Sequence, residues 1–456
     1  MSQTIVIFGA SGDLAKLKIY PALFELFSQN FLDESFSLIG YARSDLNLID
    51  FQEVVDKSIN KKVSDLGFEA DKKTEFLNKV SYISGQYDSS DDFESLFEHI
   101  ESLQKNIDES ESQSQVLCYF SVPPQVFEPL ILKLAEFNTR FNLKIVIEKP
   151  FGTSEESAKS LYSIINQRFS EHQFYLLDHY LGKISVRDIL ALRQQNSILN
   201  HLLKGKHIKS IQISALETLG VDNRLGYFDT VGSIRDMIQS HLLQVLALVA
   251  MDLPINNASV SREKGYILGS AQFHVNKGNL IIGQYEGYNN LDPNVKDSKT
   301  ETFVAVKLGI DREDWFNTPI YIRTGKKLHK KESKVVIEFT NLTTQNPKAP
   351  TNKLTIEFAP NESISMELSH TFGEIKTTEN IACAGPGCLG DYASLLNDAL
   401  SGNHLHFVTF EQIIQSWRVI DQILDFKKDL KPLEYKAGEN PSFANQIFGD
   451  TGSKWY

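Results

Sequence analysis

One segment near the start of the chain limits the possible folds more than any other. Residues 4–27 read TIVIFGASGDLAKLKIYPALFELF, an apolar run followed by a glycine turn and then by apolar residues at three- and four-residue spacing. This succession predicts a β-strand, a tight turn and an amphipathic helix. Glycines let the backbone approach a pyrophosphate, and the free amides of a helix N-terminus attract anions. We therefore expect either a structural turn or a phosphate-binding turn that uses Gly9, Ser11, Gly12, Asp13 and Leu14.

The first third of the chain alternates apolar runs with helical patterns, which is typical of a parallel sheet covered on both faces. The expected strands are 4–8, 37–41, 80–84, 116–121 and 144–147. The expected helices between them include 18–27, 51–58, 93–105 and 126–137. This pattern predicts a doubly wound, Rossmann-like α/β domain over residues 1–180.

The pattern changes after about residue 192, where strand patterns follow one another directly. Such a succession predicts a large, mostly antiparallel sheet. The expected strands are 210–215, 279–285, 302–308, 320–323, 335–339, 354–358 and 364–369, and the expected helices are 233–251, 391–400 and 410–424. We therefore predict a β+α domain over residues 181–456, so that the fold class is α/β plus α+β.

Charge and composition restrict the partners of the chain. Its 456 residues include 58 acidic and 46 basic ones, for a net charge of -12, which argues against nucleic acid or an anionic membrane as a partner. Three cysteines, Cys118, Cys383 and Cys388, are too few for a disulfide framework, so a reducing compartment fits. The N-terminus has no signal-peptide pattern and no apolar run could span a membrane. We expect a cytoplasmic protein.

Several motifs resemble those of the glucose-6-phosphate dehydrogenase family, and they occur in the family's order. They are GASGDLAKLKIYPALFELF at 9–27, GYAR at 40–43, IEKPFG at 147–152, DHYLGK at 178–183, GYFDTVGSIRDMIQSHLLQVLALVAMDLP at 226–254 and RTGKKL at 323–328. The resemblance implies hydride transfer from C1 of glucose 6-phosphate to NADP+, giving 6-phosphoglucono-δ-lactone, with no metal. It also implies a homodimer or homotetramer, with the site between the two domains.

The DHYLGK motif concentrates hydrogen-bonding side chains. His179, Tyr180 and Lys183 can each donate to a phosphate or a sugar hydroxyl. On this stretch alone, an interdomain turn with a hydrogen-bonded histidine and a solvated lysine is the preferred interpretation. The resemblance to the family assigns all three residues to the substrate and its phosphate.

A histidine lies within the longest motif. His241 is on a predicted helix whose apolar residues recur at helical spacing, where a histidine is usually a core residue. By resemblance, His241 is instead the general base that takes the proton of the C1 hydroxyl. Asp178 is implied to orient its imidazole. Hydride departure from C1 requires the oxygen to lose its proton, so the chemistry needs such a base.

The resemblance assigns further residues to the ligands. Those implied to bind the sugar or its phosphate are Glu217, Asp236, Lys326, Lys331 and Lys18, and Lys149 is implied to lie near the cofactor. For the lysines of the RTGKKLHKKES loop, a solvated basic turn is the alternative.

Cofactor preference depends on the residues after the second strand. An acidic side chain there favours NAD+, whereas an arginine can pair with the 2′-phosphate of NADP+. The sequence is GYARSD, so Arg43 favours NADP+ and Ser44 can add a hydroxyl donor. Asp45 could bind the ribose of NAD+, so some use of NAD+ is expected as well. The alternative for Arg43 is an exposed loop arginine with no role in cofactor binding.

Two positions depart from the family pattern, and two other functions remain open. Leu176 replaces a usual arginine and Ile184 a usual acid, which removes charge beside the site. One alternative is a different two-domain sugar oxidoreductase of the glucose-fructose oxidoreductase type, which would lack the phosphate ligands. The other is a noncatalytic NADP-binding protein, which would not form NADPH.

Overall fold

The chain forms two compact units, described here from a computed structural model of residues 3–67, 70–104, 115–221, 224–254, 256–341, 351–370, 373–381, 387–451 and 453–456. The first unit comprises Met1–Gly182 and Ala384–Phe410, and the second comprises Lys183–Cys383 and Glu411–Tyr456. The segment from Ala384 to Phe410 thus belongs to the first unit, whereas the sequence pattern alone assigns every residue after 180 to the second domain.

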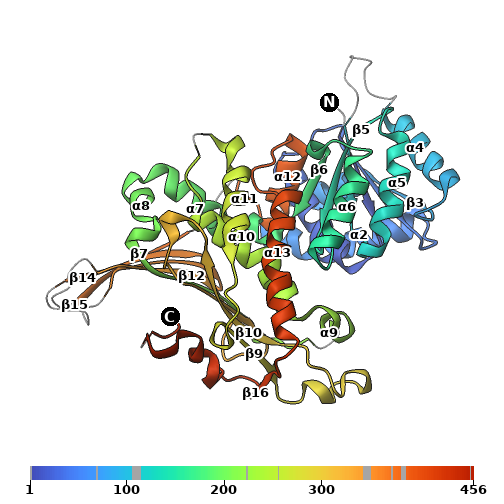
Figure 1. The fold of residues 1–456 in the computed structure, drawn as a ribbon. Helices are drawn as coiled ribbons and strands as arrows, with labels where there is room; N and C mark the ends of the chain where they lie inside the picture. The colour runs from blue at the N-terminus through green and yellow to red at the C-terminus, as the bar shows by residue number, and fades with distance from the viewer. Residues whose placement is uncertain are drawn as a thin grey trace. The chain divides into compact units, whose positions relative to one another are not determined.

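The first unit is built on a parallel six-stranded sheet (Figure 1). Its strand order is β3-β2-β1-β4-β5-β6, which is the doubly wound order of dinucleotide-binding domains. The strands are β1 (Gln3–Phe8), β2 (Ser37–Ala42), β3 (Val80–Ser84), β4 (Gln115–Phe120), β5 (Asn142–Glu148) and β6 (Phe174–Leu177). The predicted Rossmann-like domain is confirmed.

Helices follow the strands of this sheet. They are α1 (Tyr20–Ser28), α2 (Leu48–Leu66), α3 (Ala70–Leu77), α4 (Ser90–Gln104), α5 (Phe127–Phe137) and α6 (Glu155–Asn166). A π-helical turn, η1 (Ala15–Ile19), precedes α1. The helices bury apolar faces against the strands, as the spacing predicts.

A late helix completes the first unit. Helix α12 (Asp391–Ser401) packs Leu395 and Leu396 into the same core as β1 and α1. At its N-terminus the Glu25 carboxylate accepts the Gly390 amide at 2.9 Å, and at its C-terminus the Lys144 Nζ donates to the Leu400 carbonyl at 2.9 Å. Both ends of the helix are therefore held by groups of the opposite sign.

The second unit is built on a mostly antiparallel ten-stranded sheet, as predicted, in the order β15-β14-β13-β12-β7-β11-β10-β9-β16 with β8 paired to β10 (Figure 1). The β7/β11 and β9/β16 pairs are parallel. The strands are β7 (Ile208–Leu216), β8 (Ala271–Gln272), β9 (Leu280–Tyr285), β10 (Phe303–Ile310), β11 (Ile320–Gly325), β12 (Glu332–Phe339), β13 (Lys353–Ala359), β14 (Ser363–His370), β15 (Gly373–Asn380) and β16 (Leu433–Tyr435).

The helices of the second unit are α7 (Ile184–Gln195), α8 (Ser197–Leu202), α9 (Leu225–Ser233), the π-helix η7 (Ile234–Leu242), α10 (Leu243–Ala250), α11 (Val260–Ser270) and α13 (Phe410–Lys427). The buried Arg193 of α7 donates to the carbonyls of Leu248, Val249 and Met251 and so closes the C-terminal end of α10. Burial lowers the pKa of this guanidinium to about 10.

The described cysteines differ in state. Cys118 is a buried free thiol, and burial raises its pKa. Cys388 is disulfide-bonded, which the prediction of a reducing compartment does not account for. Cys383 lies outside the described residues. Within the described ranges, no helix has the length and apolarity needed to cross a lipid bilayer.

The packing of α12 leads to a stability prediction. We expect Leu396→Ala to lower the free energy of unfolding by about 2–5 kcal/mol, because the side chain is fully buried and its removal leaves a cavity. Urea unfolding followed by circular dichroism measures the change. The control is Ile49→Ala in α2, where the side chain is 77% exposed and we expect a change within about 0.5 kcal/mol. Equal stabilities of the two variants would contradict the docking of α12 in this core.

Candidate active site

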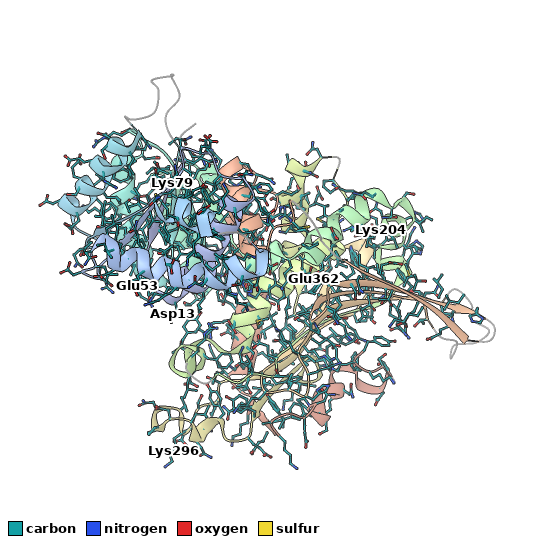
Figure 2. All side chains as sticks on the ribbon, turned by 180° about the vertical axis from the view of Figure 1, so that it is seen from behind. Asp13, Glu53, Lys79, Lys204, Lys296 and Glu362 are labelled. Carbon is teal, nitrogen blue, oxygen red and sulfur yellow. The ribbon has the colours of Figure 1, made fainter. Side chains whose placement is uncertain are left out.

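The glycine turn after β1 places backbone amides at the N-terminus of η1. Gly9 has a φ of 83°, and a Cβ at this position would lie 2.2 Å from the Ser121 carbonyl oxygen at the end of β4. Only glycine fits this left-handed and crowded position. The Gly12 amide donates to the Gly9 carbonyl at 2.9 Å, which closes the turn. Asp13 is exposed at its tip (Figure 2).

The end of β2 lies beside this turn. The Ser11 and Ser44 hydroxyl oxygens are 2.9 Å apart, which brings the glycine turn and the GYARSD segment together. Arg43 is exposed, and its guanidinium carbon lies 5.7 Å from the centre of the Tyr87 ring. The structure thus brings together predicted cofactor residues that are far apart in the sequence.

A tyrosine that the sequence reasoning missed joins several residues of the first unit. The Tyr392 ring in α12 stacks on the His179 ring at 6.4 Å, and the Lys18 Nζ lies 5.8 Å from its centre. Its hydroxyl donates to the Glu148 carboxylate at 3.4 Å. Tyr392 lies 244 residues after Glu148, and no local motif indicates the contact. Two predicted substrate residues, Lys18 and His179, thus flank one aromatic ring.

Glu148 precedes Lys149 in the IEKPFG motif. Burial raises the pKa of the Glu148 carboxyl, although hydrogen bonds from Tyr119 and Tyr392 and the charge of Lys149 oppose the increase. Lys149 is partly buried at the C-terminal end of β5, the edge of the sheet where such folds bind ligands.

Asp178 follows β6 and is fully buried. Its Oδ1 accepts the Tyr180 amide at 2.9 Å, and its carbonyl oxygen accepts the Leu181 amide at 3.0 Å. These bonds hold the DHYLGK turn in a defined conformation. Leu176, which stands where the family has arginine, is 2% exposed within β6, so an apolar side chain suits its surroundings.

In the second unit, Lys326 lies between two carboxylates. Its Nζ is 2.7 Å from Glu217 Oε2 and 3.5 Å from Asp236 Oδ2, and it lies 5.2 Å from the centre of the Phe228 ring. Lys326 follows β11, Glu217 follows β7 and Asp236 belongs to η7. The parallel pairing of β7 with β11 brings the first two together. Two residues that the resemblance assigns to the sugar hydroxyls and one that it assigns to the sugar phosphate therefore form one cluster.

The backbone around Lys326 is held from three sides. The Lys326 amide donates to the Thr302 carbonyl at 2.9 Å, and its carbonyl accepts the buried Tyr435 hydroxyl at 2.7 Å. The Leu328 amide donates to the Glu217 carbonyl at 2.9 Å. Neither Thr302 nor Tyr435 is part of a predicted motif, so their contribution is visible only in the fold.

His241 lies on η7 and is 1% exposed. π-Helical turns are rare and often occur at functional sites. Helix η7 begins at Ile234, two residues after Gly232, whose φ of 68° interrupts α9 just before its end. Asp236 and His241 are therefore carried by one short helical element.

The remaining predicted residues have separate positions. Lys183 is partly buried and precedes α7, and Lys331 is exposed before β12. Of the other loop lysines, Lys330 pairs with Glu332 at 2.9 Å and the Lys327 Nζ lies 4.7 Å from the centre of the Tyr285 ring. Asp178 belongs to the first unit and His241 to the second, so their pairing stays a prediction.

Comparisons with known proteins cover the whole chain. A family model described as glucose-6-phosphate dehydrogenase, NAD binding domain, matches residues 6–188, and one described as glucose-6-phosphate dehydrogenase, C-terminal domain, matches residues 190–456. The chain is similar to a glucose-6-phosphate 1-dehydrogenase of Emericella nidulans, with 33% identity over 99% of this chain and 92% of the relative. It is also similar to glucose-6-phosphate 1-dehydrogenase 5, cytoplasmic, of Arabidopsis thaliana, with 35% identity and the same coverage.

The chain is also similar to a solved structure of the same family. It is a glucose-6-phosphate dehydrogenase in complex with its substrate glucose 6-phosphate, with a TM-score of 0.89 and 32% identity over 100% of this chain and 98% of that chain. Both family models, the relatives and this structure extend over nearly the full length. The chain therefore belongs to the glucose-6-phosphate dehydrogenase family.

Proposed function

We propose that this enzyme oxidises C1 of glucose 6-phosphate to 6-phosphoglucono-δ-lactone and uses NADP+ as the hydride acceptor. The family membership supports the reaction. The observation that carries the sugar site is the cluster of Lys326 with Glu217 and Asp236. Two carboxylates beside one ammonium can accept hydrogen bonds from sugar hydroxyls, and the lysine can donate to a hydroxyl or phosphate oxygen.

His241 is the proposed base of this reaction. A neutral imidazole can take the C1 hydroxyl proton in the same step in which the hydride leaves C1, so that the new carbonyl forms without an unstable oxonium. The bound nicotinamide supplies the hydride acceptor. We propose Asp178 as the carboxylate that orients the imidazole and stabilises its protonated form.

The role of His241 has a direct test. We expect His241→Asn to keep the fold and lower kcat by about 10²- to 10⁴-fold, the usual contribution of a positioned base. NADPH absorbance during turnover measures the loss. The exposed His274 is the control, because His274→Asn removes an imidazole outside the proposed machinery. A folded His241→Asn enzyme with near-normal turnover would exclude this base.

The choice of cofactor rests on the turn after β1 and the end of β2. The close approach of Gly9 to Ser121 leaves no room for a side chain, which suits a turn that admits a dinucleotide. The contact of Ser11 with Ser44 brings the exposed Arg43 segment to the same turn. An arginine there can pair with the 2′-phosphate, so we propose a preference for NADP+ without absolute exclusion of NAD+.

Arg43→Ala tests this preference. We expect the Michaelis constant for NADP+ to rise, by a factor that corresponds to at most about 1.5–3 kcal/mol, which is the contribution of a hydrogen bond to a charged group. The Michaelis constant for NAD+ should change little. Initial rates with each cofactor give both constants. Arg168→Ala removes another exposed arginine of the first unit and should change neither. Equal losses with both cofactors would show that Arg43 does not read the 2′-phosphate.

The phosphate of the substrate has its own proposed ligands, His179, Tyr180 and Lys183. Charged donors bind a phosphate more strongly than a neutral hydroxyl, so we expect glucose 6-phosphate to be oxidised far more efficiently than glucose. Lys183→Ala should raise KM and lower kcat for the phosphorylated sugar, whereas Lys159→Ala, at an exposed ion pair, should not. Equal rates with glucose and its 6-phosphate would contradict these assignments.

We also propose a cytoplasmic homodimer or homotetramer. One relative carries the word cytoplasmic in its name. The edge strand β15 is exposed along its whole length, and it pairs the half-exposed Leu368 of β14 with the exposed Ile375. An exposed sheet edge with apolar side chains favours association with another chain.

A further inference from the structure

A buried carboxylate lies at the start of the helix that carries Asp236 and His241. The Glu301 side chain is 0% exposed, and its Oε1 accepts the Ile234 amide at 3.0 Å. Its backbone carbonyl accepts the Ser233 amide at 3.2 Å. Ser233 precedes η7, but its side chain makes no capping hydrogen bond there. Glu301 therefore supplies both the missing acceptor and the negative charge that a helix N-terminus favours.

The charge of Glu301 has one lysine partner from a distant part of the chain. The Lys427 Nζ, at the last residue of α13, donates to Glu301 Oε2. The lysine side chain is 19% exposed and the carboxylate is fully buried. A buried carboxylate without a counter-charge would be strongly unfavourable, so the pair joins the end of α13 to the beginning of η7.

The backbone beside the carboxylate is shaped to admit it. Gly232 has a φ of 68°, and a Cβ at this position would lie 2.5 Å from Glu301 Oε1. Any larger residue would displace the carboxylate or distort the backbone. The sequence therefore leaves a space for this side chain at Gly232, where the backbone of α9 is interrupted just before η7 begins.

The residue after Glu301 contacts the backbone of Lys326. Below, the sugar cluster means Lys326, Glu217 and Asp236. Thr302 accepts the Lys326 amide through its carbonyl at 2.9 Å. The dipeptide before β10 thus contacts the helix that carries Asp236 on one side and the loop that carries Lys326 on the other. The Nζ of Lys326 and the Oδ2 of Asp236 are 3.5 Å apart, so a shift of η7 changes the geometry of the cluster.

We propose that Glu301, held by Lys427, is a positioning residue that fixes the start of η7 and through it the side chains of Asp236 and His241. It acts through the helix and does not touch the substrate. The inference rests on the roles proposed above for Asp236 and His241.

The test uses the full-length enzyme with Glu301→Gln, which keeps the shape of the side chain and removes its charge. We expect kcat to fall about 10- to 100-fold and KM for glucose 6-phosphate to rise, because a small misplacement of reacting groups costs that much. In a His241→Asn background, Glu301→Gln should lower kcat by less than about twofold, because the effects of substituting residues that act as a unit are not additive. Lys427→Arg should keep most of the activity, because it preserves the charge.

The matched control is Glu338→Gln. Glu338 is also a buried carboxylate of the second unit paired with a lysine, Lys209. It belongs to β12, and its hydrogen bonds to Lys209, Ser210 and Thr351 lie outside the cluster of Lys326, Glu217 and Asp236. Both variants should lower the melting temperature, but only Glu301→Gln should lower kcat. Hydrogen-deuterium exchange over residues 232–242 should increase only in Glu301→Gln.

Two results would overturn the proposal. One is a Glu301→Gln enzyme that matches Glu338→Gln in kcat, and the other is unchanged exchange over residues 232–242. The exchange measurement does not depend on turnover, so it tests the positioning role by itself. If the unmodified enzyme formed no NADPH, that result would contradict the proposed reaction and not the positioning role.

Discussion

The ammonium of Lys326 between Glu217 and Asp236 is the interaction on which the proposed sugar site of the second unit depends. A charge that is mostly removed from water is tolerated only with partners, and here the partners come from two other elements. The parallel pairing of β7 and β11 places Glu217 beside Lys326, and η7 adds Asp236. One of the two parallel pairs in this mostly antiparallel sheet thus lies where two predicted site residues follow neighbouring strands.

The first unit depends instead on the close approach of backbones. At Gly9 the turn after β1 touches the end of β4, and the hydroxyls of Ser11 and Ser44 connect it to the end of β2. The amides of the turn are thereby held at the carboxyl edge of a parallel sheet. Acidic residues exceed basic ones over the whole chain, so anion binding relies on this local geometry and on a few lysines and arginines.

The sequence predicts the fold well where one local feature, such as an apolar run or a glycine turn, determines the structure of a segment. Strands β1, β2 and β4 are buried on both faces and read as apolar runs, and the glycine turn has a distinct spacing. Strand β6 escaped detection because Phe174–Leu177 is very short, and β15 because all its side chains are exposed and show no alternation. The resemblance to the family predicted the members of the Lys326 cluster. Tyr392, Thr302 and Glu301 act through contacts between distant segments, which no local pattern records.

The return of the chain to the first unit has a consequence for its biosynthesis. Helix α12 supplies part of the core and binds Glu25 and Lys144 at its two ends, yet it is translated more than 200 residues after β5. The dinucleotide-binding unit therefore cannot complete its core on the ribosome until most of the second unit has been synthesised. A gene fragment that stops near residue 188 would encode every strand of the parallel sheet and still leave an apolar surface uncovered.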